Sequence, residues 1–96
     1  MSAAYVIANV NVTDSEQYKE YQRFSSQAMA ESGARIRVRG GAVQSLEGNH
    51  PGRVVVLEFD NIEAAQAFYD SETYRQARQA RDGAAEMTMY IVEGHE

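Results

Sequence analysis

The chain has 96 residues, and we expect residues 1–96 to form a single domain. Its formal net charge of -5 argues against a nucleic-acid-binding protein, because neutralising phosphates takes a basic surface. It has no cysteine, and its two histidines, His50 and His95, are far apart, so the sequence indicates no disulfide, no metal site and no cofactor.

The first predicted element is a strand over residues 3–12, AAYVIANVNV, which are apolar and partly alternating. The start of the chain is too short and polar for a signal peptide, and no apolar stretch is long enough to span a membrane. We therefore expect a cytoplasmic protein that does not bind membranes.

A helix is predicted next, because Thr13 and Glu16 have the spacing of a capping box. Gly33 is a suitable end for this helix, since glycine readily adopts the left-handed conformation that closes many helices. Apolar residues recur at helical spacing between these points and form one face: Tyr18, Tyr21, Phe24, Ala28 and Met29.

Two strands are predicted in the middle of the chain. The segment ARIRVRG, residues 34–40, alternates apolar and charged residues, which places Arg35, Arg37 and Arg39 on one face. A short extended piece and a turn containing Pro51 follow in residues 42–52. The run RVVVLEF, residues 53–59, is nearly all apolar, which is typical of a strand buried on both faces.

The last third of the chain predicts a broken helix and a final strand. Asp60 and Glu63 have the spacing of a second capping box, and Ser71 is a candidate cap where the helix restarts before Gly83. The strand is EMTMYIVEG, residues 86–94.

The element order β-α-β-β-α-β predicts an α+β, ferredoxin-like fold with a four-stranded antiparallel sheet and two helices on one face. The other face of that sheet is left open. Because residues on both faces of the first and third strands are apolar, we expect a homodimer that joins two open faces by two-fold symmetry.

Five segments resemble the domain-of-unknown-function 1330 family, a branch of the dimeric α/β-barrel superfamily. They are residues 37–41 (RVRGG), 46–48 (LEG), 53–59 (RVVVLEF), 64–81 (AAQAFYDSETYRQARQAR) and 91–94 (IVEG). The resemblance implies a ferredoxin-like fold and a dimer whose two sheets form a barrel, and it implies no established reaction. Related branches include cofactor-independent monooxygenases, isomerases, dehalogenating or dye-binding enzymes, and members without known activity. The family often has an aromatic residue near the turn where this chain has GNHPG, residues 48–52.

Two arginines in the family motifs are candidate ligand-binding residues. Arg39 precedes two glycines, and a guanidinium pairs well with a carboxylate because its donors match both oxygens. Glu58, Glu47 and an acidic ligand are all candidate partners, so a structural ion pair and a ligand role both stay open. Glu58 is itself expected to pair with an arginine, since an unpaired buried carboxylate is costly. Arg81 closes the segment YRQARQAR and is the second candidate.

Tyrosines and one histidine complete the candidate set. Tyr18 lies on the inward face of the first helix and Tyr69 near the break in the second. Such tyrosines either pack in the core with the hydroxyl at its rim or line a cleft between helices and sheet. His50 has the chemistry of a general base, but neighbouring turn-forming residues favour an exposed loop.

Two functions remain open from the sequence. The first is a cofactor-free enzyme or a binder of a small acidic or aromatic molecule in the cleft. The second is a dimeric structural or interaction module with no catalytic activity. A ligand-sized cavity would favour the first, and a cleft filled by the chain's own side chains would favour the second. The candidate ligand-binding residues are Arg39, Tyr18, Tyr69, Arg81, His50 and Glu58.

Overall fold

The predicted order of elements is confirmed, with the second helical region divided into two helices. A computed structural model describes residues 2–50 and 52–96. The elements are β1 (Ala4–Val12), α1 (Ser15–Ser32), β2 (Arg35–Arg39), β3 (Arg53–Phe59), α2 (Ile62–Asp70), α3 (Glu72–Ala80) and β4 (Ala85–Glu93).

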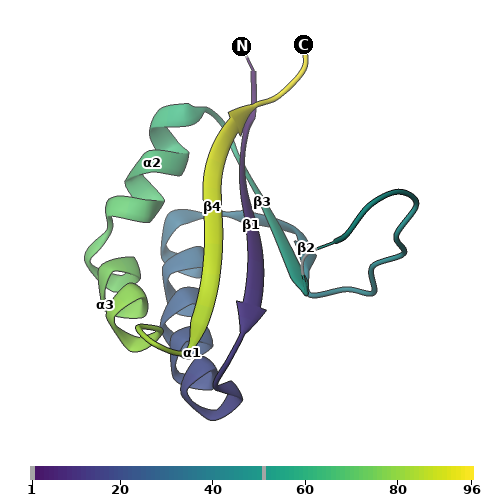
Figure 1. Ribbon diagram of the computed structural model, residues 1–96. Coiled ribbons are helices and arrows are strands. Elements are labelled where there is room, and N and C mark those ends of the chain that lie inside the picture. The colour runs from purple at the N-terminus through teal and green to yellow at the C-terminus, as the bar shows by residue number, and fades with distance from the viewer. Residues whose placement is uncertain (1, 51) are drawn as a thin grey trace.

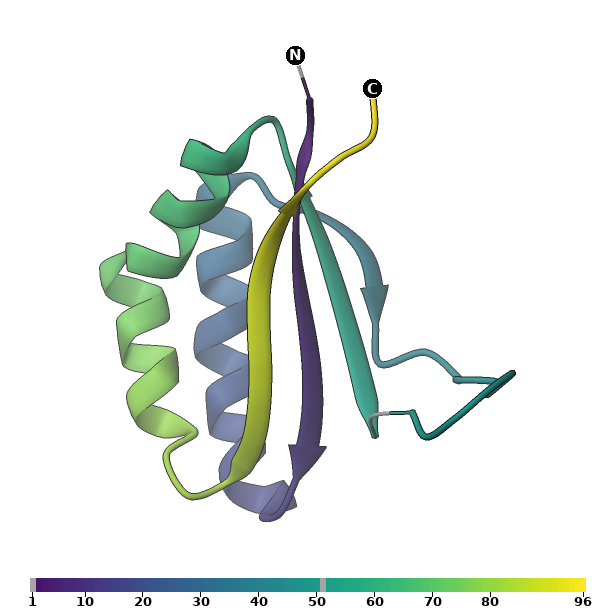
Figure 2. The ribbon, with the colours of Figure 1, turned by 45° about the horizontal axis from the view of Figure 1, so that its top comes forward.

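The strands form one antiparallel sheet in the order β2-β3-β1-β4. All the helices of the described chain lie on one side of this sheet, and α3 packs beside α1 (Figure 1). Turning the molecule shows the other side of the sheet bare of helices (Figure 2). This is the α+β, ferredoxin-like arrangement that the sequence predicts.

The N-caps of two helices lie one residue after the predicted positions. The Asp14 carboxylate, not Thr13, accepts a hydrogen bond from the backbone N–H of Gln17 at 3.1 Å. Asn61, not Asp60, caps α2, and its side chain accepts from the N–H of Ala64. Asp and Asn are at least as good as Thr at this position, so local chemistry does not distinguish neighbouring cap candidates.

The other two predicted helix boundaries are confirmed. Gly33 ends α1 with a φ of 71°, in the left-handed region that favours glycine. The Ser71 hydroxyl accepts from the N–H of Tyr74 and so begins α3 just where α2 ends. This break lets two short helices follow the sheet where one straight helix would leave it.

The core lies between the helices and one face of the sheet. Strand alternation sends Val6, Ala8 and Val10 of β1 and Leu57 and Phe59 of β3 toward the helices, and all five are buried. The helices supply the remaining large buried side chains of this core: Tyr18, Tyr21, Met29, Phe68 and Tyr74.

The opposite, open face carries a contiguous apolar patch. The strand registers place its members side by side: Ile7 lies between Val56 and Tyr90, and Val56 pairs with Val38. We call this set the open-face patch: Tyr5, Ile7, Val38, Val54, Val56, Tyr90 and Val92. Within one chain these residues are partly or fully exposed, so β3 is not buried on both faces as its composition predicts.

A β-bulge in β2 overturns the prediction that its three arginines share a face. Ile36 pairs with Leu57 and Val38 with Val56, so Arg37 is an extra residue on the β2 side. Arg35 pairs with Glu58 on the open face, whereas Arg39 pairs with Val55 on the helix face. Strict alternation fails because the bulge changes the parity of the residues that follow it.

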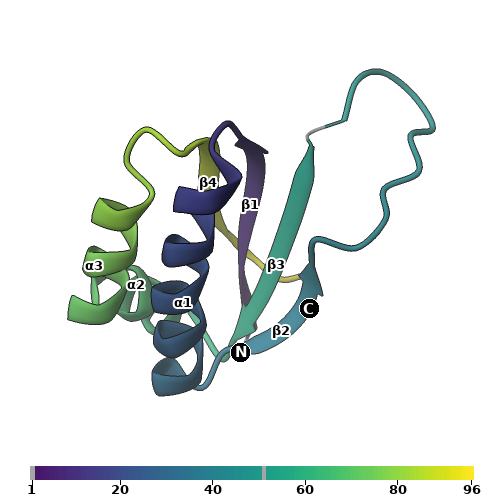
Figure 3. The ribbon, with the colours of Figure 1, turned by 90° about the horizontal axis from the view of Figure 1, so that it is seen from below.

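The segment between β2 and β3 forms a long exposed loop rather than the predicted extended piece. We call residues 40–52 the β2–β3 loop. Its described residues, 40–50 and 52, are all exposed, and no strand occurs among them. Pro51, part of the predicted turn, lies outside the described residues. Seen from below, the loop projects away from the sheet on the side opposite the helices (Figure 3).

Candidate functional site

A narrow cleft between α1 and the sheet brings polar side chains into an otherwise apolar space. Val10, Val55 and Met87 form part of its wall, and the arginines Arg39 and Arg53 also line it. We call this space the α1–sheet cleft. Its enclosed volume is about 20 Å³, room for roughly one water molecule. The chain's own side chains therefore fill most of it.

Three tyrosines stand at the helix side of the α1–sheet cleft. The hydroxyls of Tyr21 in α1 and Tyr74 in α3 are 2.8 Å apart, and the rings of Tyr18 and Tyr21 are 5.1 Å apart. Burial raises the pKa of Tyr74, and the neighbouring Tyr21 adds to the effect. Burial also raises the pKa of Tyr18. Both phenols therefore stay protonated at neutral pH and can donate hydrogen bonds.

Arg81 lies behind this tyrosine cluster rather than in the cleft itself. It follows the last residue of α3, and its guanidinium lies 3.2 Å from the Tyr74 hydroxyl and 2.7 Å from the sulfur of Met87. Its charge opposes the rise in the pKa of Tyr18. Arg81 is thus part of the polar network around Tyr74, and its role in ligand binding stays a prediction.

Arg39 and Arg53 enter the α1–sheet cleft from neighbouring strands. Arg39 donates to the Ser26 hydroxyl of α1 at 2.6 Å. Arg53 lies close enough to Tyr18 to oppose the rise in the pKa of that phenol, while the buried Nε of Arg53 has no hydrogen-bond partner. Gly40 makes room for the Arg53 guanidinium, because a Cβ there would collide with it, and its φ of 71° also favours glycine.

The arginines of the cleft lack acidic partners among the described residues. Among the residues that the structure describes, ion pairs with carboxylates are made by Lys19, Arg23, Arg35, Arg37 and Arg75, all of which lie outside the cleft. Neither Arg39 nor Arg53, which line the cleft, makes such a pair, and neither does Arg81 beside it. The described lining of the cleft also contains no carboxylate and no histidine. The cleft is therefore a site of concentrated positive charge and hydrogen-bond donors.

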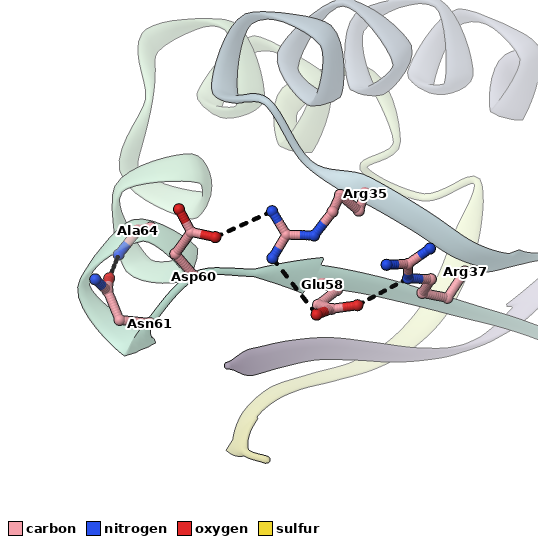
Figure 4. A network of polar contacts seen from close by, with 6 residues as sticks. All are labelled: Arg35, Arg37, Glu58, Asp60, Asn61 and Ala64. Carbon is pink, nitrogen blue, oxygen red and sulfur yellow. Dashed lines mark hydrogen bonds and ion pairs between the residues drawn. The ribbon is translucent and has the colours of Figure 1, made fainter. Parts of the chain in front are cut away.

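The opposite face of the sheet holds a compensated cluster of charges. Glu58 accepts from Arg37 at 2.8 Å and lies 3.5 Å from Arg35, which also reaches Asp60 at 3.1 Å (Figure 4). The hydrogen bond from Arg37 holds the pKa of Glu58 below its usual value, although partial burial acts in the other direction. The prediction that Glu58 pairs with arginine is confirmed, but Arg39 is not its partner.

The remaining candidate residues lie outside the α1–sheet cleft. Tyr69 lies in a separate groove beside β4, with the Arg78 guanidinium stacked 4.4 Å from its ring centre. His50 is on the exposed β2–β3 loop. Glu58 faces the other side of the sheet. Of the six candidates, the cleft brings together Tyr18 and Arg39, with Arg81 adjoining them through Tyr74.

Arg53 is the principal site residue that was missed. Its position could have been predicted, because strand alternation places residue 53 on the same face as Val55, Leu57 and Phe59. The alternation is difficult to recognise because residues on both faces of this strand are apolar. Tyr74 was also missed as a site residue. Its place depends on where α2 breaks, and it points inward only because Ser71 restarts the helix.

The described residues form neither a metal site nor a membrane-spanning helix. No group of three or more His, Cys, Asp or Glu side chains among them is arranged to hold a metal ion. None of the helices in residues 2–50 and 52–96 combines the length and apolar character needed to cross a membrane.

Solved structures share this fold at low sequence identity. A protein of unknown function from Rhodopseudomonas palustris is 18% identical, with a TM-score of 0.77 over 99% of this chain and 84% of that one. A dimeric ferredoxin-like protein of unknown function from a Jannaschia species is 10% identical, with a TM-score of 0.73 over 96% and 99%. The cofactor-independent oxygenase SnoaB from Streptomyces nogalater is 7% identical, with a TM-score of 0.67 over 100% and 96%. At these identities, the similarity shows a shared fold and nothing about function.

Family membership rests on the sequence itself. No curated protein is similar enough to the chain to be matched with it. One family model covers residues 3–95, which is almost the full length and includes both the cleft and the open face. The chain belongs to the family described as domain of unknown function (DUF1330).

Proposed function

We propose that the protein is a homodimer that binds a small organic anion at the mouth of the α1–sheet cleft. One observation carries the proposal: Arg39 and Arg53 both line this cleft and neither meets a carboxylate among the described residues. A guanidinium binds a carboxylate in a planar, two-point fashion, because its donors match both oxygens.

The strand register supports placing the anion between these arginines. Arg39 pairs with Val55, and Arg53 lies two residues along β3 on the same face. Such diagonal neighbours have Cα atoms roughly 7–8 Å apart, so long side chains can reach one bound group. Two like charges at this distance repel each other, and a bound anion would relieve the repulsion.

The size and lining of the cleft bear on the rest of the ligand. A volume of about 20 Å³ admits no organic molecule unless side chains move. Arg39 and Arg53 are only partly buried and have long side chains, so they are the groups best able to swing outward. The tyrosine and methionine walls behind them favour an aromatic or other apolar body attached to the carboxylate.

The groups in the cleft favour binding over acid–base catalysis. Burial raises the pKa of both Tyr18 and Tyr74, so at neutral pH they act as donors rather than bases. The name of one structural relative, a cofactor-independent oxygenase, describes that protein's chemistry. At 7% identity this likeness carries no assignment of a reaction here.

The proposed homodimer rests on the open-face patch. Seven apolar side chains on one face of a 96-residue chain form a surface that proteins of this size seldom leave in water. Several proteins with this fold are described as dimeric. Pairing two patches about a two-fold axis would cover both surfaces at once.

A second candidate function is a dimeric module that binds no small molecule. The observation in its favour is that the chain's own side chains fill the cleft almost completely. Under this alternative Arg39 and Arg53 are covering groups whose stems shield the core from water.

Anion binding separates the two candidates. Benzoate is a suitable probe, because it joins a carboxylate to a small aromatic ring. Calorimetric titration should detect saturable binding to the native chain and to Arg35→Gln, which changes an arginine on the open face. Binding should be lost in Arg53→Gln and weakened at least about tenfold in Arg39→Gln, a loss of about 1.4 kcal/mol.

Equal benzoate affinity in all four proteins would contradict the proposed site, as would no binding to the native chain at millimolar ligand. The dimer is tested separately by sedimentation of the native chain at micromolar concentration. We expect a dimer mass, and Val56→Asp, in the centre of the open-face patch, should sediment as a monomer. A monomeric native chain would end this part of the proposal.

A further inference from the structure

The β2–β3 loop is a long segment of the described chain that extends beyond the sheet of its own subunit. It runs for thirteen residues between the two strands, and its described residues are all exposed. Loops this long without secondary structure are uncommon in small domains and usually serve a function. The loop also carries apolar side chains: Leu46 is 87% exposed and Val43 is 38% exposed.

The direction of the loop matters more than its length. Views from two directions agree that it extends away from the sheet on the side opposite the helices (Figures 1 and 3). That is the side on which the open-face patch lies. Any molecule seated on the patch must therefore lie beside the loop.

A second copy of this chain fits that position better than an unrelated partner. If two patches meet about a two-fold axis, each loop projects toward the other subunit. The same symmetry operation that covers the patch then covers both loops. No additional partner is needed to explain the exposed apolar residues of either surface.

We propose that the β2–β3 loop is a dimerisation arm, which packs Val43 and Leu46 against the second copy. This inference rests on the proposed homodimer and adds a second contact to it. The loop has its own internal order for the purpose, since the Ser45 hydroxyl donates to the Gly48 carbonyl and closes a turn around Leu46. The side chain of Leu46 within this turn is 87% exposed.

The test compares two single charges placed in the same loop. Leu46→Asp should weaken dimerisation at least about tenfold, because burying a leucine contributes one to two powers of ten to a binding constant. Gln44→Asp adds the same charge to an exposed polar position and should leave the dissociation constant within about threefold of native. Sedimentation over a range of concentrations measures all three proteins.

A labelling experiment covers the case in which a loop variant is misfolded. The chain has no cysteine, so Leu46→Cys and Gln44→Cys can each carry one environment-sensitive fluorophore. On dilution below the dissociation constant, emission from position 46 should shift to the red as the arm leaves its partner. Emission from position 44 should change less.

Two outcomes would overturn the inference about the loop and leave the proposed homodimer intact. One is a Leu46→Asp protein that dimerises as tightly as the native chain. The other is a probe at position 46 whose emission is that of a water-exposed dye at every concentration. A native chain that is monomeric throughout would instead refute the proposed homodimer, on which the arm depends.

Discussion

Arginines lie on both faces of the sheet, but among the described residues those on the open face alone meet carboxylates. On the open face, Arg35 and Arg37 share Glu58, and Arg35 also reaches Asp60. On the helix face, Arg39 donates to the hydroxyl of Ser26, and Arg53 lies near the phenol of Tyr18. One strand pair thus holds two kinds of cationic site.

The difference separates a charge that belongs to the scaffold from one that is available to a ligand. An arginine that already holds a carboxylate must give it up before binding another anion. An arginine held by a neutral hydroxyl loses little when an anion replaces it, because charged hydrogen bonds are the stronger ones. Four predictions test how the two faces of the sheet differ, beginning with the largest expected effect.

Neighbouring residues on β3 should show that the two faces are energetically distinct. Leu57→Ala, at a core position only 2% exposed, should lower the free energy of unfolding by about 2–5 kcal/mol. Val56→Ala, on the open face, should cost clearly less when the chain is too dilute to dimerise. Urea unfolding followed by circular dichroism gives both values, and equal losses at low concentration would break the contrast.

Adjacent glycines at the end of β2 test the space reserved for Arg53. Gly40→Ala should lower the free energy of unfolding by about 1–2 kcal/mol, because its φ is positive, and the new methyl group should also displace the Arg53 guanidinium. Gly41→Ala meets no atom within 4 Å and should change stability by less than about 0.5 kcal/mol. Thermal unfolding compares the pair, and similar losses at both positions would remove the special role of Gly40.

Removing an arginine from the helix face should cost little. In Arg53→Met the long apolar stem is retained, and no carboxylate is left without a partner. We expect the free energy of unfolding to change by less than about 1 kcal/mol in either direction. A larger loss in chemical denaturation would mean that Arg53 is a scaffold residue, and the ligand proposal would lose its main support.

The ion pair between Glu58 and Arg37 on the open face should make stability depend on pH. The pKa of Glu58 is lowered in the folded chain, so its contribution is fully present above the ordinary carboxylate pKa of about 4.3. The contribution is lost as pH falls through the folded-state value. Glu58→Gln should therefore be slightly less stable than native at pH 7 and equally stable near pH 2. A difference that does not shrink on acidification would contradict the pairing.

The helices and strands and their order could be predicted from local patterns that are recognisable in the sequence. Gly33 and Ser71 mark helix boundaries because one needs a left-handed conformation and the other caps a helix with its hydroxyl. The open apolar face follows from the alternation in β1 and β3. These features depend on residues near one another in the chain, so they could be predicted.

The composition of the site could be predicted only in part. The place of Tyr18 could be predicted, because it lies on the inward face of α1. The pairing of Arg37 with Glu58 depends on the β-bulge at Arg37, and a bulge cannot be recognised in a sequence that alternates regularly. The meeting of Tyr21 with Tyr74 joins residues 53 positions apart. Contacts of this kind depend on how helices settle on the sheet, which local patterns do not specify.

The bulge in β2 makes the length of that strand a determinant of the charge in the cleft. A strictly alternating strand would place Arg39 opposite Val54 on the open face, whereas the extra residue places it opposite Val55. Deleting Arg37 would remove the bulge and leave Val38 and Arg39 facing as they do now. Deleting one residue after Val38 would instead bring Gly40 into the position of the arginine. Insertions and deletions in this strand would therefore change the charge of the cleft without any substitution in its walls.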